Sequence, residues 1–120
     1  MKTLTLIVLR GPYEDEVPYT AIRIAQKARE RGYQVNIFTF LDGTYISHHK
    51  QTTKEYPNVA ELLGETIKSG LFNPKLSFVA CIRCTNARGI TDEMINGVVI
   101  GGLYDALRWM RESDKTIVLT

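Results

Sequence analysis

Short apolar runs alternate with amphipathic stretches along the chain, and the two patterns have different periods. An apolar run of roughly four to eight residues, rich in β-branched side chains, is typical of a strand buried in a sheet. Runs of this kind predict strands over residues 3–9, 35–41, 76–80 and 115–119. A shorter run over residues 98–100 predicts a further short strand or the beginning of the last helix.

Stretches with apolar residues three and four positions apart predict helices between these strands. The first covers about residues 18–31, with acidic residues before its start, basic residues at its end and Gly32 as its stop. That charge arrangement suits the helix dipole, and glycine commonly ends a helix. The second helix begins at Asn58, which forms a capping-box pattern with Glu61, and it ends at Gly70.

Two more helices are expected in the last third of the chain. A short one follows Cys81 and ends at Arg88, because Gly89 stops it. The final helix carries an apolar stripe that we expect to face the core, made of Leu103, Ala106, Leu107 and Met110. On the neighbouring faces of that helix, Tyr104 and Trp109 are expected to serve a contact between subunits.

Strands separated by helices predict an α/β fold in three layers, with helices on both faces of a mostly parallel sheet of about five strands. This sandwich is Rossmann-like or flavodoxin-like. Because 120 residues suffice for one hydrophobic core, we expect residues 1–120 to form a single domain. Residues 44–57 are expected to form a polar loop. Two histidines in this loop, His48 and His49, are adjacent in sequence and so lack the usual spacing of paired metal ligands. We therefore expect no metal site there.

Composition and charge narrow the classes of function. Hydrophobic residues make up 44% of the chain and charged residues 23%, the balance of an ordinary globular protein. The net charge of +2 comes with no basic cluster, so we expect no direct binding of nucleic acid. No apolar segment approaches the ~20 residues of a membrane span, and the first residues lack a signal-peptide cleavage site. We therefore expect a cytoplasmic protein without a membrane contact.

The two cysteines, Cys81 and Cys84, need a chemical explanation. Their Cys-x-x-Cys spacing closes too short a loop for a disulfide to stabilise the fold much, and a reducing compartment disfavours one. Ligands of parallel sheets bind beyond the carboxyl ends of the strands, where Cys81 is expected to lie. The N–H groups of the following helix favour its thiolate, and Arg83 and Arg88 add positive charge nearby.

The cysteine segment resembles a known family. Phe-Val-Ala-Cys at 78–81, followed by Ala-Arg-Gly-Ile-Thr-Asp-Glu at 87–93, is similar to the DsrE/DsrF/TusD group of sulfur-relay proteins. Members of that group carry a cysteine at the end of the third strand and then an Arg-Gly-Val/Ile-x-Asp-Glu-like segment. Residues 32–45 and 114–119 resemble the group's second and last strands, so the resemblance covers nearly the whole chain as one DsrE-like domain.

This resemblance implies a persulfide relay without a cofactor or metal ion. Cys81 would accept sulfane sulfur from a donor protein and pass it to an acceptor protein. From the residues themselves, Arg83 and Arg88 are the candidate substrate-binding residues: Arg83 lends positive charge from a solvated position, and Arg88 either binds an anionic donor or caps the helix end. The resemblance also implies a homo-oligomer, a trimer or hexamer. Cys84 stands where the tRNA-thiolation members usually have a small residue, which favours general sulfane-sulfur handling over the tRNA pathway.

Two other functions remain open on the sequence. Cys81 and Cys84 together could act as a thiol–disulfide redox pair, since Cys-x-x-Cys beside an α/β pattern permits that chemistry. Alternatively, the strand ends could bind an anion or a partner without catalysis. Cys84 itself could resolve a Cys81 persulfide or merely line the inner side of the short helix. A carrier requires Cys81 alone, a redox protein requires both cysteines, and a binding module requires neither.

Overall fold

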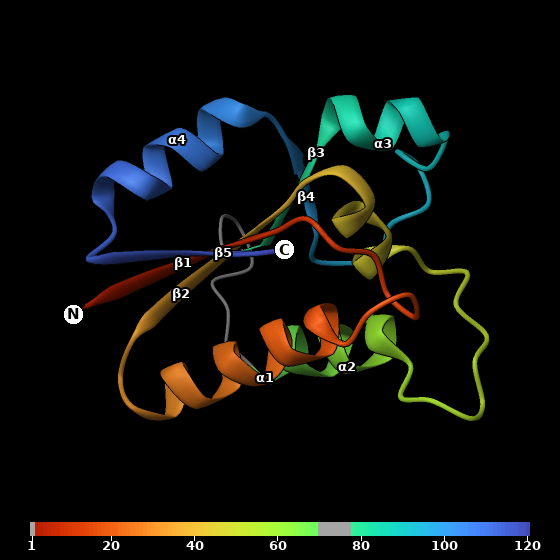
Figure 1. Ribbon diagram of the computed structural model, residues 1–120, viewed down its shortest axis with the longest axis horizontal. Coiled ribbons are helices and arrows are strands. Elements are labelled where there is room, and N and C mark those ends of the chain that lie inside the picture. The colour runs from red at the N-terminus through yellow and green to blue at the C-terminus, as the bar shows by residue number, and fades with distance from the viewer. Residues whose placement is uncertain (1, 70–77) are drawn as a thin grey trace.

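A computed structural model describes residues 2–69 and 78–120, and it contains one five-stranded sheet (Figure 1). The strands are β1 (Thr3–Val8), β2 (Gln34–Thr39), β3 (Phe78–Cys81), β4 (Val99–Gly101) and β5 (Lys115–Leu119). Their order across the sheet is β4-β3-β2-β1-β5, and each neighbouring pair is parallel. The predicted parallel α/β sheet is confirmed, including the short strand near residues 98–100.

Helices cover both faces of the sheet, as predicted for a three-layer sandwich. They are α1 (Val17–Glu30), α2 (Val59–Lys68), α3 (Ile82–Arg88) and α4 (Leu103–Glu112), together with the 3₁₀ helix η1 (Leu41–Ser47). Figure 1 shows α1 and α2 on one face and α3 and α4 on the other. No helix within residues 2–69 and 78–120 is long and apolar enough to cross a membrane.

Each face of the sheet has its own cluster of buried side chains. Ile37 packs with residues of α1 and α2, whereas its neighbour Phe38 packs with Cys81, Cys84 and residues of α4. This division follows from the alternation of side chains along a strand. Both cysteines therefore belong to the core on the α3 and α4 side of the sheet.

Local sequence signals fixed most helix ends. Asn58 Oδ1 accepts a hydrogen bond from the Glu61 N–H at 3.0 Å, which caps the start of α2 as predicted. Gly89 ends α3 with a φ of 69°, in the left-handed region that glycine enters at little cost. The predicted stop at Gly70 and the predicted strand residues 76 and 77 lie outside the described residues.

The prediction of a polar loop over residues 44–57 is wrong for its first part, because the chain forms η1 there. Thr44, Ile46 and Ser47 are buried, and Ile46 joins the core under α1 and α2. Gly43 lies so close to β1 that a Cβ atom there would overlap the Val8 carbonyl oxygen. The buried Thr44 hydroxyl donates a hydrogen bond to the Leu41 carbonyl oxygen at 2.8 Å, so its polar group is satisfied locally.

The predicted core face of α4 is confirmed for Ala106 and wrong for its three large residues. Leu103, Leu107 and Met110 are 58%, 55% and 46% exposed, whereas Ala106 and Trp109 are buried. The helix packs Ala106 and Trp109 on the sheet. Its rotation about its own axis therefore differs from the predicted one, and the aliphatic stripe faces outward. Trp109 is therefore part of the core and cannot serve the predicted subunit contact.

Candidate functional site

Cys81 is the last residue of β3 and immediately precedes the first residue of α3. Its backbone is extended, with φ −64° and ψ 126°, and it lies opposite Gly101 of β4. The side chain is only 2% exposed. The predicted place at the carboxyl edge of the sheet is thus confirmed, and it is the edge where parallel sheets bind their ligands.

Cys84 lies one helical turn further on, in α3, and is also buried. Both cysteines are free thiols. Leu41 is the first residue of η1, two residues after the end of β2. Its backbone N–H donates a hydrogen bond to the Cys84 sulfur at 3.1 Å. The sulfur of Cys84 is therefore held between α3 and the segment that follows β2.

Burial raises the pKa of the Cys84 thiol above its ordinary value, and the neighbouring Cys81 raises that pKa further. The Leu41 N–H and the charge of Arg88 act in the opposite direction and lower the pKa in part. Because the net direction is upward, Cys84 is a protonated thiol at neutral pH. The raised pKa suppresses the thiolate, which is the nucleophilic form of Cys84.

Leu41 has an unusual backbone. Its φ is +54°, a conformation that L-residues with side chains rarely adopt. In the described part of the chain, the other non-glycine residue with positive φ is Tyr13, which follows β1 at the same edge of the sheet. Strained residues of this kind collect at functional sites more often than elsewhere. Both strained positions thus point to the carboxyl edge as the working surface.

The two arginines predicted to serve the site have different surroundings. The Arg88 Nε donates to Asp42 Oδ1 at 2.8 Å, and its Nη1 donates to the Cys84 carbonyl oxygen at 3.1 Å. Arg88 therefore connects α3 to the segment after β2 and lies beside Cys84. Arg83 is exposed on α3. The structure brings Arg88 to the cysteine pair through a specific contact and leaves Arg83 facing solvent.

A second ionic group fastens the end of η1 to the segment after α3. Glu93 accepts hydrogen bonds from Lys50 at 2.8 Å and pairs with His48 Nε2 at 2.7 Å. The main chain joins the same two segments, since the His49 N–H donates to the Glu93 carbonyl oxygen at 3.0 Å. Lys50 and then His48 lower the pKa of Glu93 from 4.5 to about 2. His48 thus has a carboxylate partner that its neighbour His49 does not share.

A model of the DsrE/DsrF-like family matches residues 2–119 of this chain. The chain belongs to the DsrE/DsrF-like family. That match covers the cysteine segment, the strand end at Asp42 and the ionic group at Glu93 alike.

Three known proteins are similar to this chain over almost its whole length. The chain is 36% identical over 115 residues to the uncharacterized protein MK0008 of Methanopyrus kandleri, covering 95% of this chain and 91% of that protein. The protein YchN of Escherichia coli is 28% identical over 120 residues, 98% of each chain. The crystal structure of YchN superposes with a TM-score of 0.87 over 99% of this chain and 100% of that one. The structure of MTH1491 from Methanobacterium thermoautotrophicum shares the fold, with a TM-score of 0.75 over 98% of this chain and 99% of that one. The two sequences are 15% identical.

The sequence of this DsrE/DsrF-like protein contained one signal that its interpretation missed. Asp42 directly follows the predicted second strand, as Cys81 ends the third, and the carboxyl ends of neighbouring parallel strands meet at one edge. A carboxylate at one strand end and an arginine after the next strand are natural partners. The Asp42–Arg88 pair could therefore have been predicted. The hydrogen bond from the Leu41 N–H to Cys84 could not have been predicted, because it depends on a backbone conformation that no residue type in this segment indicates.

Proposed function

We propose that this DsrE/DsrF-like protein carries sulfane sulfur as a persulfide on Cys81 and passes it from a donor protein to an acceptor protein in cytoplasmic sulfur metabolism. The observation that carries the proposal is the position of Cys81. It ends β3 at the ligand-binding edge of the sheet, beside a second thiol, in a chain of this family. The proposal defines the donor and the acceptor only by their chemistry, as a source of sulfane sulfur and as a thiol that receives it.

The transfer is a displacement at sulfur and needs no external oxidant. The Cys81 thiolate attacks the outer sulfur of a persulfide or of thiosulfate, and the S–S bond of the donor breaks. The donor leaves as a thiolate or as sulfite, and Cys81 becomes a persulfide anion. An acceptor thiolate then attacks that outer sulfur, and Cys81 leaves as a thiolate. The sulfane sulfur keeps its oxidation state throughout.

Access to Cys81 requires an opening at the carboxyl edge. Two contacts tie α3 to the segment after β2, the Leu41 N–H bond to Cys84 and the Arg88–Asp42 pair. The Asp42 side chain is 52% exposed, so water and small anions reach this pair. An anionic donor would compete with the Asp42 carboxylate for the Arg88 guanidinium. Arg88 is thus the residue that would receive the donor, with Arg83 adding charge from the exposed side of α3.

The protonated state of Cys84 supports a carrier. A Cys84 thiolate would attack the inner sulfur of a Cys81 persulfide, form a disulfide and expel hydrosulfide, which destroys the cargo. The raised pKa of Cys84 suppresses that thiolate at neutral pH. Burial of Cys84 therefore lengthens the life of the persulfide that we propose on Cys81.

The second candidate function is a thiol–disulfide redox protein. It is favoured by one observation, the presence of two free thiols three residues apart at the start of α3, within the same cluster of buried side chains. Two neighbouring thiols form a disulfide when an oxidised partner thiol pair accepts their two electrons and two protons. Loading with thiosulfate separates the two functions. A carrier gains one sulfur atom, loses the adduct in Cys81→Ser and keeps it in Cys84→Ser, whereas a redox pair yields only the internal disulfide and needs both cysteines.

We also propose that the protein is a homo-oligomer, a trimer or hexamer, formed through α4 and β5. The exposed apolar side chains of these two elements are Leu103, Tyr104, Leu107, Met110, Ile117 and Val118. β5 is an edge strand, so its outer backbone groups are also available for pairing. Exposed large apolar side chains in this number are typical of a protein–protein contact. A second copy of the chain is the partner that we propose for it.

A further inference from the structure

A cavity separate from the cysteine pair lies at the carboxyl edge of the sheet. Its volume is about 490 Å³, and it is lined by the segment after β1, by part of η1 and by residues 50–53. Neither cysteine lines it. Both its size and its position beyond the ends of β1 and β2 are those of small-molecule sites in α/β proteins.

The walls of this cavity are held in place by a connected set of hydrogen bonds. The Tyr13 hydroxyl donates to Gln51 Oε1 at 2.7 Å and accepts from the Val59 N–H at 3.2 Å. The Gln51 Nε2 donates to the carbonyl oxygens of Tyr45, Ile46 and His48 at 2.9 to 3.0 Å. Tyr13 also has a φ of +73°. A rigid wall that includes a strained residue indicates a site formed before its ligand arrives.

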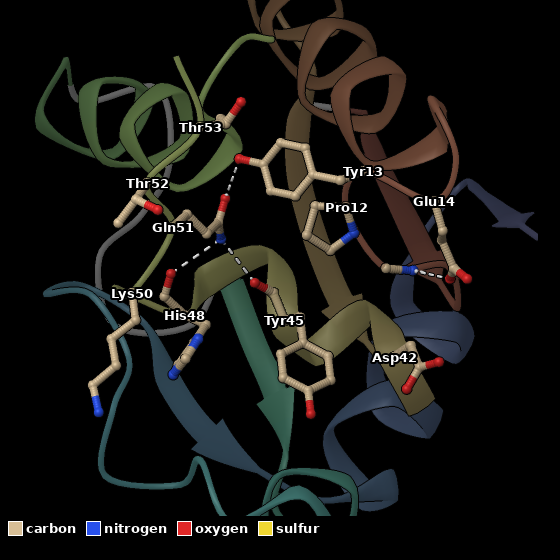
Figure 2. Close-up of a pocket in the computed structure, with 11 residues that line it drawn as sticks. Pro12, Tyr13, Glu14, Asp42, Tyr45, His48, Lys50, Gln51, Thr52 and Thr53 are labelled. Atoms are coloured by element: carbon tan, nitrogen blue, oxygen red, sulfur yellow. Dashed lines mark hydrogen bonds between the residues drawn. The ribbon is translucent and has the colours of Figure 1, made fainter. Parts of the chain in front are cut away.

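The charges around the cavity are divided by sign. Figure 2 shows the carboxylates of Glu14 and Asp42 on one side of the Tyr45 ring, and the side chains of His48 and Lys50 on the other. These charged groups already have internal partners, but they keep capacity for another. Asp42 uses Oδ1 for Arg88, and Lys50 uses one of its three N–H donors for Glu93.

We propose that this cavity binds a zwitterion of dipeptide size, with the ligand ammonium at Glu14 and Asp42 and the ligand carboxylate at Lys50. The cavity volume is about 490 Å³, and a cube of that volume has an edge of about 8 Å. Two extended residues span roughly 7 Å, so a dipeptide fits within it. A peptide backbone thus places its two charges at the two charged sides, with the Tyr45 ring beside its middle.

Other small ligands fit the charges less well. A phosphate or another compact dianion carries a second negative charge that Lys50 cannot match alone, and it brings no cation to the carboxylates of Glu14 and Asp42. A simple amine would leave the Lys50 side without an anion. The site goes beyond the proposed persulfide function, because it contains no cysteine and its occupation needs no sulfur chemistry.

The test uses the full chain with both cysteines replaced, Cys81→Ser with Cys84→Ser, so that failure of sulfur loading cannot affect the outcome. The probes are alanyl-alanine, its N-acetyl form, which lacks the ammonium, and its C-terminal amide, which lacks the carboxylate. Amide NMR shifts are followed during titration. We expect saturable binding of alanyl-alanine with shifts at residues 11–14 and 42–53, and at least ~10-fold weaker binding of each blocked form.

Two substitutions assign the charges, and each has a control of the same residue type outside the cavity lining. Glu14→Gln should weaken binding of the free dipeptide and of the amide and leave binding of the N-acetyl form unchanged. Lys50→Met should weaken binding of the free dipeptide and of the N-acetyl form and leave binding of the amide unchanged. The controls Glu55→Gln and Lys54→Met, in the connection between η1 and α2, should leave binding of all three probes unchanged. Absence of saturable binding, or equal binding of the three probes, would overturn the proposal.

Discussion

The backbone N–H of Leu41 points at the sulfur of Cys84 across 3.1 Å, and this bond joins the end of β2 to the helix that follows β3. It holds Cys84 in place while burial keeps that thiol protonated. Both cysteines are buried, and they differ in position: Cys81 ends β3, whereas Cys84 lies in α3 and accepts the Leu41 N–H. The raised pKa of Cys84 makes it a poor nucleophile at neutral pH.

The first prediction concerns that locked thiol. In Cys81→Ser, the remaining Cys84 should react with iodoacetamide with a pH midpoint above 9.0, because burial is the largest cause of its raised pKa and persists in the variant. The rate measured against pH gives the midpoint. The protonated form is preferred in the folded state, so Cys84 stabilises the fold below pH 9.0, and this contribution is lost as pH rises through its folded pKa. A midpoint below 9.0 would contradict the assignment.

The second prediction concerns the Arg88–Asp42 pair. Asp42→Asn should free the guanidinium and speed sulfur loading from thiosulfate a few-fold, whereas Arg88→Gln should slow it by roughly tenfold. Alkylation of Cys81 by the uncharged reagent iodoacetamide, followed on its tryptic peptide, should change little in either variant, because no anion has to be bound. Arg108→Gln is the matched control, since Arg108 pairs with Asp105 on α4. Equal slowing of sulfur loading and of alkylation by Arg88→Gln would assign Arg88 a purely structural role.

The third prediction follows from the ionic group at Glu93. Its pKa of about 2, against 4.5 in an ordinary carboxyl, means that ionised Glu93 stabilises the fold above pH 4.5. That contribution should disappear as pH falls from 4.5 to about 2. The free energy of unfolding of the parent and of Glu93→Gln, compared by urea titration, should differ at neutral pH and converge in acid. A difference independent of pH would rule out the ionised pair as its cause.

The fourth prediction tests the α4 and β5 surface. Leu107→Glu should reduce the mass in solution to that of a monomer, because it places a charge in the middle of the exposed apolar stripe. Sedimentation or light scattering gives the mass. Tyr56→Glu, at a residue that is 67% exposed and outside α4 and β5, is the control and should leave the assembly intact. A parent protein that is already monomeric at micromolar concentration would refute the interface.

The sequence predicted the sheet and its helices because each element carries its own local signal. The capping side chain of Asn58 and the helix stop at Gly89 both act within a few residues, so they can be recognised without the fold. The place of Cys81 followed from the same logic, since the end of an apolar run marks the end of a strand.

The features that were missed depend on contacts between distant segments. The aliphatic stripe of α4 has the same spacing whether it faces the core or another molecule, and only packing shows that Trp109 is the buried residue. Asp42 and Arg88 are 46 residues apart and meet because their strands are neighbours. The left-handed backbone of Leu41 carries no sequence signal at all, since leucine is not a residue expected there.

The most direct test of the account follows one labelled sulfur atom to its cysteine. Arg83 lies between the two cysteines, so trypsin separates Cys81 and Cys84 into different peptides. The protein is loaded with thiosulfate labelled in its outer sulfur, alkylated under conditions that preserve persulfides, digested and examined by mass spectrometry. We predict one labelled sulfur atom on the Cys81 peptide, none on the Cys84 peptide, and loss of the label when an acceptor thiol is added. Label on the Cys84 peptide alone, or only the Cys81–Cys84 disulfide, would contradict the proposal that Cys81 carries the sulfur.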